Sequence, residues 1–235
     1  MRWLRKQIAR FGSGNLLLKA ELAVIVAGPV LLMSLPFQLL RFSTVFLLAG
    51  YCLWRLKHNG VIGAYLQFNW TGCRKALPGV VLRCFLGAIA IIAIVLVVSP
   101  ERLFCIPRAD PMLMVLIVAF YGLVSVLPQE IVFRGYAAWR LDSFNVPFLP
   151  ALFISALLFG WVHILFGSLL SVVLSMAAGL SFFRTYRKYR SLAAVWLEHS
   201  LIGIAIFAFG LDNLFYLGPT PEAFASVCSA TVAAR

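Results

Sequence analysis

Apolar stretches, most of them long enough to cross a lipid bilayer, follow one another along this chain. A spanning helix needs roughly 20 mainly apolar residues. Hydrophobic residues make up 63% of the 235 positions and charged residues only 12%, about half the charged share of soluble domains. One soluble core could not bury so much apolar surface, so the sequence predicts an all-α fold, a polytopic transmembrane bundle of about seven or eight helices. The apolar stretches are residues 22–40, 42–56, 80–98, 112–127, 148–166, 169–183 and 192–209.

The net charge of +12 is explained by membrane topology better than by affinity for nucleic acid. When successive connections are assigned to alternate sides, most of the 20 Lys and Arg residues fall on the side of the amino terminus. Cytoplasmic connections carry such an excess, so the amino terminus is predicted to be cytoplasmic. Membrane lipids are therefore expected as partners, anionic ones above all, and nucleic acid is not. The basic residues on the other side are Arg41, Arg102, Arg108 and Arg235.

Several connections lead to predictions of their own. Residues 57–77, which are basic and rich in Trp, Gly and Asn, are expected to lie at the cytoplasmic interface and to end at Pro78. Residues 101–110 should form a short external loop. A kinked or broken helix is expected at Pro128, because proline removes a backbone donor. Residues 210–218 should be a short final helix or a re-entrant piece.

The five cysteines are scattered along the chain without any paired short spacing. This pattern is neither a zinc ribbon nor a disulfide framework. They are expected to act as small buried hydrophobes.

Three polar clusters interrupt the apolar stretches. A charged side chain at the bilayer centre costs about 2.5–3.5 kcal/mol on insertion scales, so such residues usually face a functional interior. The first two clusters also have a structural explanation: an ion pair between residues four apart on one helix face for the first, and a hydrogen bond between packed helices for the second. The third cluster is harder to explain as purely structural, because two adjacent ionisable groups lie deep in an apolar stretch. The clusters are Gln129-Glu130 with Arg134, Phe159 with His163, and Glu198-His199.

Brought together from three helices, these side chains offer two imidazoles, carboxylates, an amide and a guanidinium. Such a set can hold a hydrolytic water, supply a general base and neutralise an oxyanion. It includes a ligand set that zinc accepts, namely His163, His199 and Glu130. The order does not match the His-Glu-x-x-His pattern, in which both histidines share one helix.

The three clusters resemble the motif series of the CPBP family of intramembrane proteases, which includes the CAAX prenyl endopeptidases and the abortive-infection-type proteins. That series reads Glu-Glu-x-x-x-Arg, Phe-x-x-x-His and His-x-x-x-Asn or Asp, and the resemblance covers about residues 113–215. It implies a multi-pass membrane peptidase that cleaves near the cytoplasmic side, with a glutamate-activated water in a conical cavity and histidines that position the water and stabilise the oxyanion. Metal dependence in the family has been argued both ways.

The resemblance also suggests how the chain is divided and where it lies. Residues 1–110 would hold amino-terminal membrane helices and the interfacial segment, 111–218 a CPBP-like protease core, and 219–235 a flexible tail. The substrate would be a membrane-anchored or hydrophobic-tailed protein, a CAAX-type tail being one option. The plasma or inner membrane of a bacterium is the expected location.

Two positions depart from the family series. Gln129 stands where the first Glu is expected, and an amide cannot take a proton from water. Gly203 stands where the third motif has Asn or Asp. A displaced carboxylate could serve as the base, either Glu130 or Glu198. His163 and His199 would then hold water and oxyanion, while Arg134 fixes Glu130 and Gln129 donates a hydrogen bond.

Two other functional classes remain open at the level of sequence. A catalytically inactive pseudoprotease or membrane adaptor would bind the same substrate without cutting it. A small transporter or proton-relay protein would also place ionisable groups within the membrane, although no internal repeat is visible.

Overall fold

The structure, a computed structural model, describes residues 20–21, 23–34 and 38–215, and within these ranges it contains helices and no strand. Five helical segments in this part of the chain are long and apolar enough to cross a membrane. The predicted all-α polytopic bundle is confirmed. The amino-terminal basic residues and the predicted tail 219–235 lie outside the described residues. The five segments are Ile62–Val98, Pro111–Ser143, Phe148–Phe166, Leu169–Tyr189 and Leu192–Phe209.

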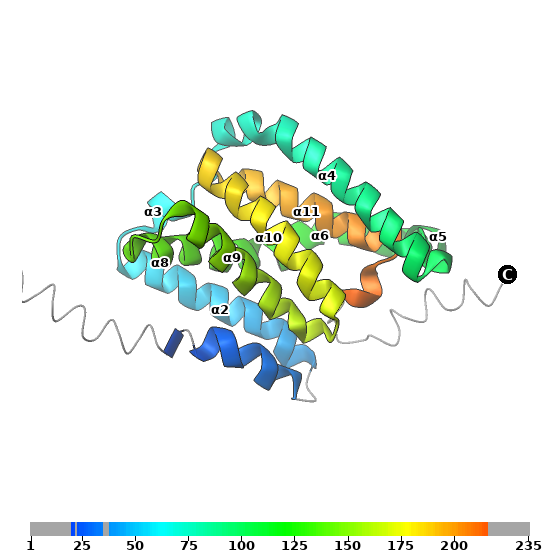
Figure 1. The fold of residues 1–235 in the computed structure, drawn as a ribbon, viewed down its shortest axis with the longest axis horizontal. Coiled ribbons are helices and arrows are strands. Elements are labelled where there is room, and N and C mark those ends of the chain that lie inside the picture. The colour runs from blue at the N-terminus through cyan, green and yellow to red at the C-terminus, as the bar shows by residue number, and fades with distance from the viewer. Residues whose placement is uncertain (1–19, 22, 35–37, 216–235) are drawn as a thin grey trace, which may run out of the picture.

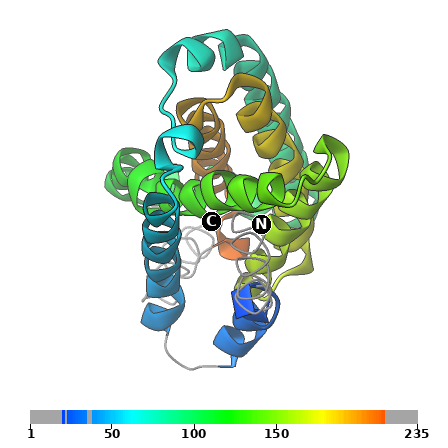
Figure 2. The same cartoon turned by 90° about the vertical axis from the view of Figure 1, so that its left-hand side faces the viewer.

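The helices pack side by side around the polar stretches of the sequence (Figure 1). α10 (Leu169–Tyr189) packs along α9 (Phe148–Val162), and α11 (Leu192–Phe209) packs along α4 (Trp70–Val98). In both views α4 lies at one edge of the bundle and the helix Ala23–Met33 at the other (Figures 1 and 2). The segments that carry the three polar clusters therefore lie between these edges.

Two further helices lie between the helix Ala23–Met33 and α4, and one of them was not foreseen as a separate element. α2 (Gln38–His58) covers the predicted stretch 42–56, and the short α3 (Ile62–Tyr65) lies within the predicted interfacial segment. α4 begins where the side chain of Asn69 accepts a hydrogen bond from the Gly72 backbone nitrogen over 3.0 Å, as a helix N-cap residue does.

The prediction that Pro78 ends the interfacial segment is wrong, because α4 runs through Pro78 from Trp70 to Val98. Membrane helices tolerate proline where neighbouring groups satisfy the freed backbone. Arg83 consequently lies within the spanning segment, so this residue does not belong to the cytoplasmic excess of basic residues.

The segment Pro111–Ser143 is also not broken at its proline. After α6 (Pro111–Tyr121) the backbone adopts a π-helix over η2 (Gly122–Val126), returns to α7 (Leu127–Glu130), and widens again in η3 (Ile131–Tyr136) before α8 (Ala137–Ser143). π-helical turns are rare and frequently occur at functional sites. Here they bracket Gln129 and Glu130, and the second stretch contains Arg134.

The connection 101–110, predicted to be external, is more ordered than a plain loop. It contains the 3-10 turn η1 (Pro100–Arg102) and the short helix α5 (Cys105–Ala109). Arg102 Nη2 forms an ion pair over 2.7 Å with the buried Asp212, in the turn η5 (Asp212–Leu214). The predicted final element 210–218 is therefore a 3-10 turn as far as Phe215, and its remainder lies outside the described residues.

The cysteines only partly follow the prediction. Cys52 and Cys73 are free and buried, and Cys84 is free and half-buried. Cys105 is disulfide-bonded, with its partner outside the described residues. Disulfides persist in oxidising compartments, so a bonded cysteine in this connection agrees with the predicted external side.

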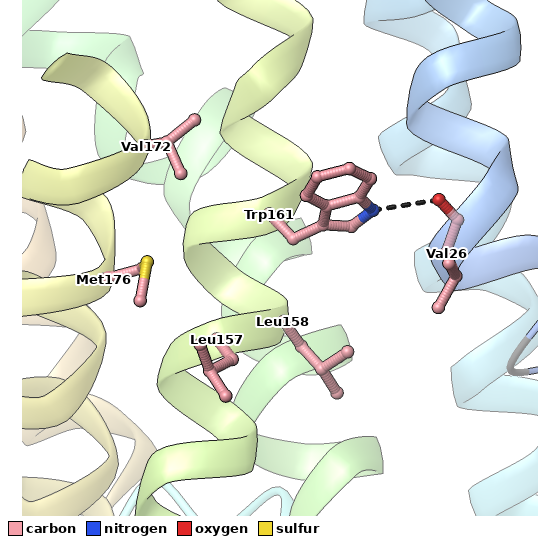
Figure 3. A pocket seen from close by; sticks show the side chains of 6 residues that line it. All are labelled: Val26, Leu157, Leu158, Trp161, Val172 and Met176. Carbon is pink, nitrogen blue, oxygen red and sulfur yellow. Dashed lines mark hydrogen bonds between the residues drawn. The ribbon is translucent and has the colours of Figure 1, made fainter. Parts of the chain in front are cut away.

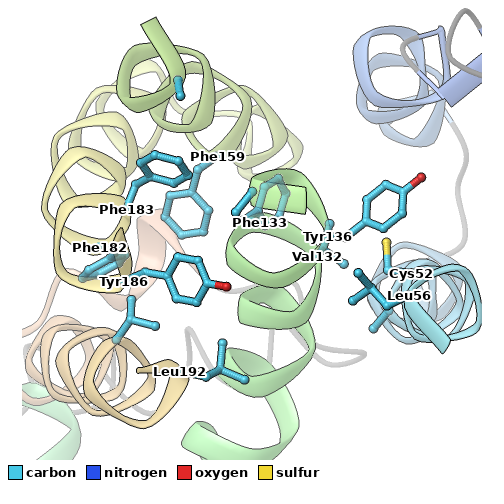
Figure 4. Packing of buried hydrophobic residues seen from close by; sticks show 14 residues of the cluster. Cys52, Leu56, Val132, Phe133, Tyr136, Phe159, Phe182, Phe183, Tyr186 and Leu192 are labelled. Carbon is cyan, nitrogen blue, oxygen red and sulfur yellow. The ribbon is translucent and has the colours of Figure 1, made fainter. Parts of the chain in front are cut away.

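Aromatic side chains form the centre of the bundle (Figure 4). Phe159 contacts Phe133 and Phe182 edge-on, with ring centroids 5.3 and 5.9 Å apart. Phe183 and Tyr186 complete this layer. Because the main core cluster includes both Phe133 and Phe159, the first two polar clusters are held against one apolar layer.

The helix Ala23–Met33 contacts the bundle through α9. The indole nitrogen of Trp161 donates a hydrogen bond to the Val26 carbonyl oxygen over 2.9 Å. An apolar cleft of about 350 Å³ lies between these elements (Figure 3). Many large apolar side chains on the outer faces are exposed, Val97 at 84% among them, as expected of faces that contact lipid. The cleft is lined by Val26, Leu157, Leu158, Trp161, Val172 and Met176.

Candidate functional site

The carboxylate of Glu130 forms a fully buried pair with the imidazole of His199. Glu130 ends α7 between the two π-helical stretches, and its side chain is 0% exposed. The Nδ1 atom of His199, on α11, donates a hydrogen bond to Glu130 Oε1 over 2.7 Å. Because a carboxylate only accepts, Nδ1 carries the proton and Nε2 is left as an acceptor in the neutral ring. The structure thus joins the first cluster to the third.

Arg134 compensates the charge of Glu130 without using its hydrogen-bond donors. Its Nε lies 3.2 Å from Glu130 Oε2, an ion-pair distance, but the two groups are not aligned for a hydrogen bond. All three guanidinium nitrogens and Oε2 are buried without a hydrogen-bond partner. The guanidinium lies 4.3 Å from the Phe159 ring centroid and 5.1 Å from that of Phe182, so cation–π attraction holds it.

Unpaired buried donors are uncommon in folded proteins. Here they belong to a cation that a carboxylate and two aromatic rings hold in place, while its directional bonds stay free. The combination suits a site that receives polar groups of a substrate or of the attacking water.

His163 joins this group through Phe159. It begins the 3-10 turn η4 (His163–Phe166), and its Nδ1 donates to the Phe159 carbonyl oxygen over 2.6 Å. Its Nε2 is therefore also an acceptor in the neutral ring. The Phe159 ring lies edge-on to both imidazoles, with centroids 4.7 Å from His163 and 5.4 Å from His199. Both histidines thus border the same aromatic ring.

The second face of His199 is covered by Phe182, whose ring stacks on it with centroids 4.7 Å apart. His163 is 8% exposed and His199 6%, whereas Glu130 and Arg134 are 0% exposed. Access to the site is therefore on the side of the two imidazoles.

Gln129 is not part of this contact network. Its amide nitrogen donates to the Ser125 carbonyl oxygen over 3.0 Å and to the Ser125 hydroxyl over 3.2 Å. The side chain is half-buried and bound to the preceding turn of its own helix. A carboxylate could not make either of these donated bonds, so this local structure requires the amide.

Glu198 adjoins His199 in sequence, but its carboxylate binds a different set of partners. Arg83 on α4 donates to both oxygens, over 2.7 and 3.0 Å. Ser181 and Thr185 on α10 donate over 2.5 and 2.6 Å. Each oxygen of this buried carboxylate is therefore bonded twice. The suggestion that Glu198 replaces the missing base loses its support, because its acceptor positions are used within the fold.

The suggested zinc ligands were tested against the same contacts. Among the described residues, no group of three or more His, Cys, Asp or Glu side chains lies in an arrangement that could hold a metal ion. The ring nitrogen of His199 that faces Glu130 is joined to it by a hydrogen bond, and His163 uses Nδ1 on a carbonyl oxygen. Zinc binding by Glu130, His163 and His199 stays a prediction, and no step below uses a metal ion.

Sequence reasoning missed Arg83 as a partner, although its sequence position inside an apolar stretch could have indicated it. A cation in a spanning helix usually pairs with another charge. The sequence could not indicate the roles of Ser181, Thr185 and Ser125, because hydroxyl side chains are common in membrane helices.

The fold and the site together define an integral membrane protein with a buried carboxylate–imidazole pair at its centre. Residues 111–205 match the family model described as Type II CAAX prenyl endopeptidase Rce1-like. The match confirms, over this segment, the resemblance inferred from the motif series. It includes the two π-helical stretches and all the polar residues of the three clusters. No curated protein and no solved structure matches the chain.

Proposed function

We propose that the protein is an intramembrane endopeptidase that hydrolyses a peptide bond in a membrane-anchored or hydrophobic-tailed protein. The observation that carries the proposal is the 2.7 Å hydrogen bond between Glu130 and His199 inside a segment that matches a protease family. Nearby, Arg134 keeps unpaired donors at the same buried carboxylate. A CAAX-type prenylated tail is one such substrate, and the plasma or inner membrane of a bacterium is the location we propose.

In the mechanism that this geometry favours, His199 is the general base and Glu130 holds it. Nε2 of His199 takes a proton from water as the water oxygen attacks the carbonyl carbon of the peptide bond. Glu130 accepts from Nδ1, fixes the tautomer and stabilises the imidazolium that forms, as the carboxylate does in a catalytic triad. The proton then passes to the departing amine as the carbon–nitrogen bond breaks.

His163 and Arg134 have supporting roles in this scheme. Nε2 of His163 accepts the second hydrogen of the water and so orients its oxygen toward the carbonyl. Arg134 Nε lies 3.2 Å from Glu130 Oε2 and balances the charge of this carboxylate. Gln129, bound to Ser125, has no direct role in proton transfer.

A second candidate is a pseudoprotease that binds the same class of substrate without cutting it. The observation that favours it is Gln129, which stands where the family series has a carboxylate and is built into its helix as an amide. The two candidates differ in turnover, not in binding.

The test is cleavage of a quenched fluorescent peptide with a farnesylated CAAX-type tail by the chain in proteoliposomes. We expect His199→Ala to lower kcat by at least about 10³-fold, as loss of a base in a triad does, and His163→Ala by about 10²-fold. His58→Ala is the matched control, because the third histidine is exposed and stacks on Trp54 instead. Undiminished cleavage by His199→Ala would refute the mechanism. Binding of the peptide without turnover by the unaltered protein would favour the pseudoprotease.

A further inference from the structure

The space beside Gly203 is filled by Tyr121, a residue from a different helix. A Cβ atom added to Gly203 would overlap the Cε1, Cζ and hydroxyl oxygen of Tyr121. Tyr121 ends α6 and Gly203 lies on α11. The phenol ring also packs edge-on against Phe207, with centroids 5.5 Å apart. Glycine at this position therefore admits the phenol group to the surface of α11.

This place is next to the Glu130–His199 pair. Gly203 follows His199 by four positions, so both lie on one face of α11 in successive turns. Between them, Ser200 is 7% exposed and its hydroxyl has no hydrogen-bond partner. A buried hydroxyl without a partner thus lies close to Gly122, the residue after Tyr121, on the same helix as His199.

Hydroxyl and amide groups along the α6–α7 segment orient the phenol. Ser125 follows Tyr121 by four positions, and the Ser125 hydroxyl accepts from the Gln129 amide over 3.2 Å. A serine hydroxyl has one proton and two acceptor positions. With Gln129 donating to it, Ser125 can give its own proton to the Tyr121 oxygen. The phenolic proton of Tyr121 is then available to another acceptor.

The imidazoles themselves supply no such donor, and Arg134, whose donors are unpaired, is 0% exposed. In their neutral tautomers His163 and His199 present only acceptors, because each Nδ1 proton is already used. Glu130 is an acceptor as well, and Gln129 gives its donors to Ser125. Attack on a peptide carbonyl builds negative charge on its oxygen, which needs a donor aimed at it.

We propose that Tyr121 donates a hydrogen bond from its phenolic hydroxyl to the carbonyl oxygen of the scissile peptide bond, at the place on α11 left open by Gly203. The inference rests on the proposed endopeptidase function. The bond strengthens as the carbonyl oxygen becomes an oxyanion, and Tyr121 keeps its proton throughout. On this view the two departures from the family series are linked, because Gln129 and Gly203 each support the position of one phenol group.

The primary test is Tyr121→Phe, which keeps the ring against Gly203 and removes the hydroxyl alone. We expect kcat for the farnesylated peptide to fall about 10²-fold, the effect of losing one oxyanion donor, with KM and the melting temperature nearly unchanged. Tyr51→Phe is the matched control, because its hydroxyl donates to Glu21 over 2.9 Å, outside the site. Its kcat should equal that of the unaltered protein.

A swap of the two side chains tests the shared space. Gly203→Asn alone should lower the melting temperature, because the new side chain meets Tyr121. Adding Tyr121→Ala should restore much of the lost melting temperature, and the amide of the double variant should give a higher kcat than Tyr121→Ala alone. If neither the melting temperature nor kcat of the double variant rises, the result would contradict a position shared by the two side chains.

The outcomes separate this inference from the function on which it rests. Full kcat in Tyr121→Phe together with an inactive His199→Ala would overturn the role of Tyr121 and leave the endopeptidase in place. Absence of cleavage by the unaltered protein would overturn both. A selective loss of kcat in Tyr121→Phe would support both.

Discussion

Two buried carboxylates in this bundle have opposite surroundings. Glu198 receives four hydrogen bonds, two of them from Arg83 and the others from hydroxyl groups. Glu130 receives one, from His199, and its ion-pair partner Arg134 keeps its donors unpaired. Both side chains are 0% exposed. Burial alone therefore does not separate a structural carboxylate from a functional one.

The two carboxylates differ in how many of their acceptor positions are used by hydrogen bonds. A carboxylate whose acceptor positions are all used can join helices, here α11 to α4 and α10, but it cannot accept another proton without losing those bonds. One with an open position, beside an imidazole, can take part in proton transfer. Glu198 and His199 are adjacent on one helix, yet their side chains belong to two different hydrogen-bond networks.

The largest expected effect separates the two carboxylates directly. Glu130→Gln removes the charge that stabilises the His199 imidazolium, so we expect kcat to fall by about 10⁴-fold, as when the carboxylate of a triad becomes an amide. In Glu198→Gln, kcat below the melting temperature should stay within a few-fold of the unaltered protein. Cleavage of the farnesylated peptide by monodisperse protein in proteoliposomes measures both.

Glu198→Gln should lower the free energy of unfolding, although it leaves kcat nearly unchanged. Its replacement leaves Arg83 without a charged partner, and because that side chain is 35% exposed we expect a loss of about 2 kcal/mol, less than for a fully buried pair. Equal loss of kcat in the two variants would erase the distinction between the two carboxylates.

An intermediate effect is expected from Gln129→Glu, which restores the family residue. A carboxylate there cannot donate to the Ser125 carbonyl oxygen and would face it, so we expect a loss of stability of about 2 kcal/mol and no gain in kcat. Thermal unfolding in detergent and the peptide assay measure the two quantities. A rise in turnover would show that the unaltered site is incomplete, in favour of the pseudoprotease.

The smallest effect is expected from Ser181→Ala. It removes one of the four donors to Glu198 and leaves Arg83 and Thr185 in place, so we expect a loss of about 1 kcal/mol with kcat unchanged. Thermal unfolding resolves such a change. A large loss of cleavage in this variant would tie the Glu198 network to catalysis after all.

Much of the fold was predictable because apolar stretches of spanning length leave few alternatives. The predicted stretch 192–209 coincides with α11, and 148–166 with α9 together with η4. The effects of proline within the helices were predicted less well. Pro78 was expected to end the interfacial segment, but α4 passes through it, whereas a kinked or broken helix was expected at Pro128 and π-helical turns flank it. In a membrane helix, neighbouring groups can satisfy the backbone that proline disturbs.

The sequence by itself determined that the chain is a bundle of membrane helices, because lipid leaves no other way to bury so much apolar surface and satisfy the backbone. It also marked the three polar clusters, since charge within such helices needs a reason. Only the tertiary structure decided which of those side chains meet. Spacing along one helix cannot say that His199 reaches Glu130 while Glu198 reaches Arg83. That choice depends on how α11 is rotated between its neighbours, which the packing of many side chains fixes together.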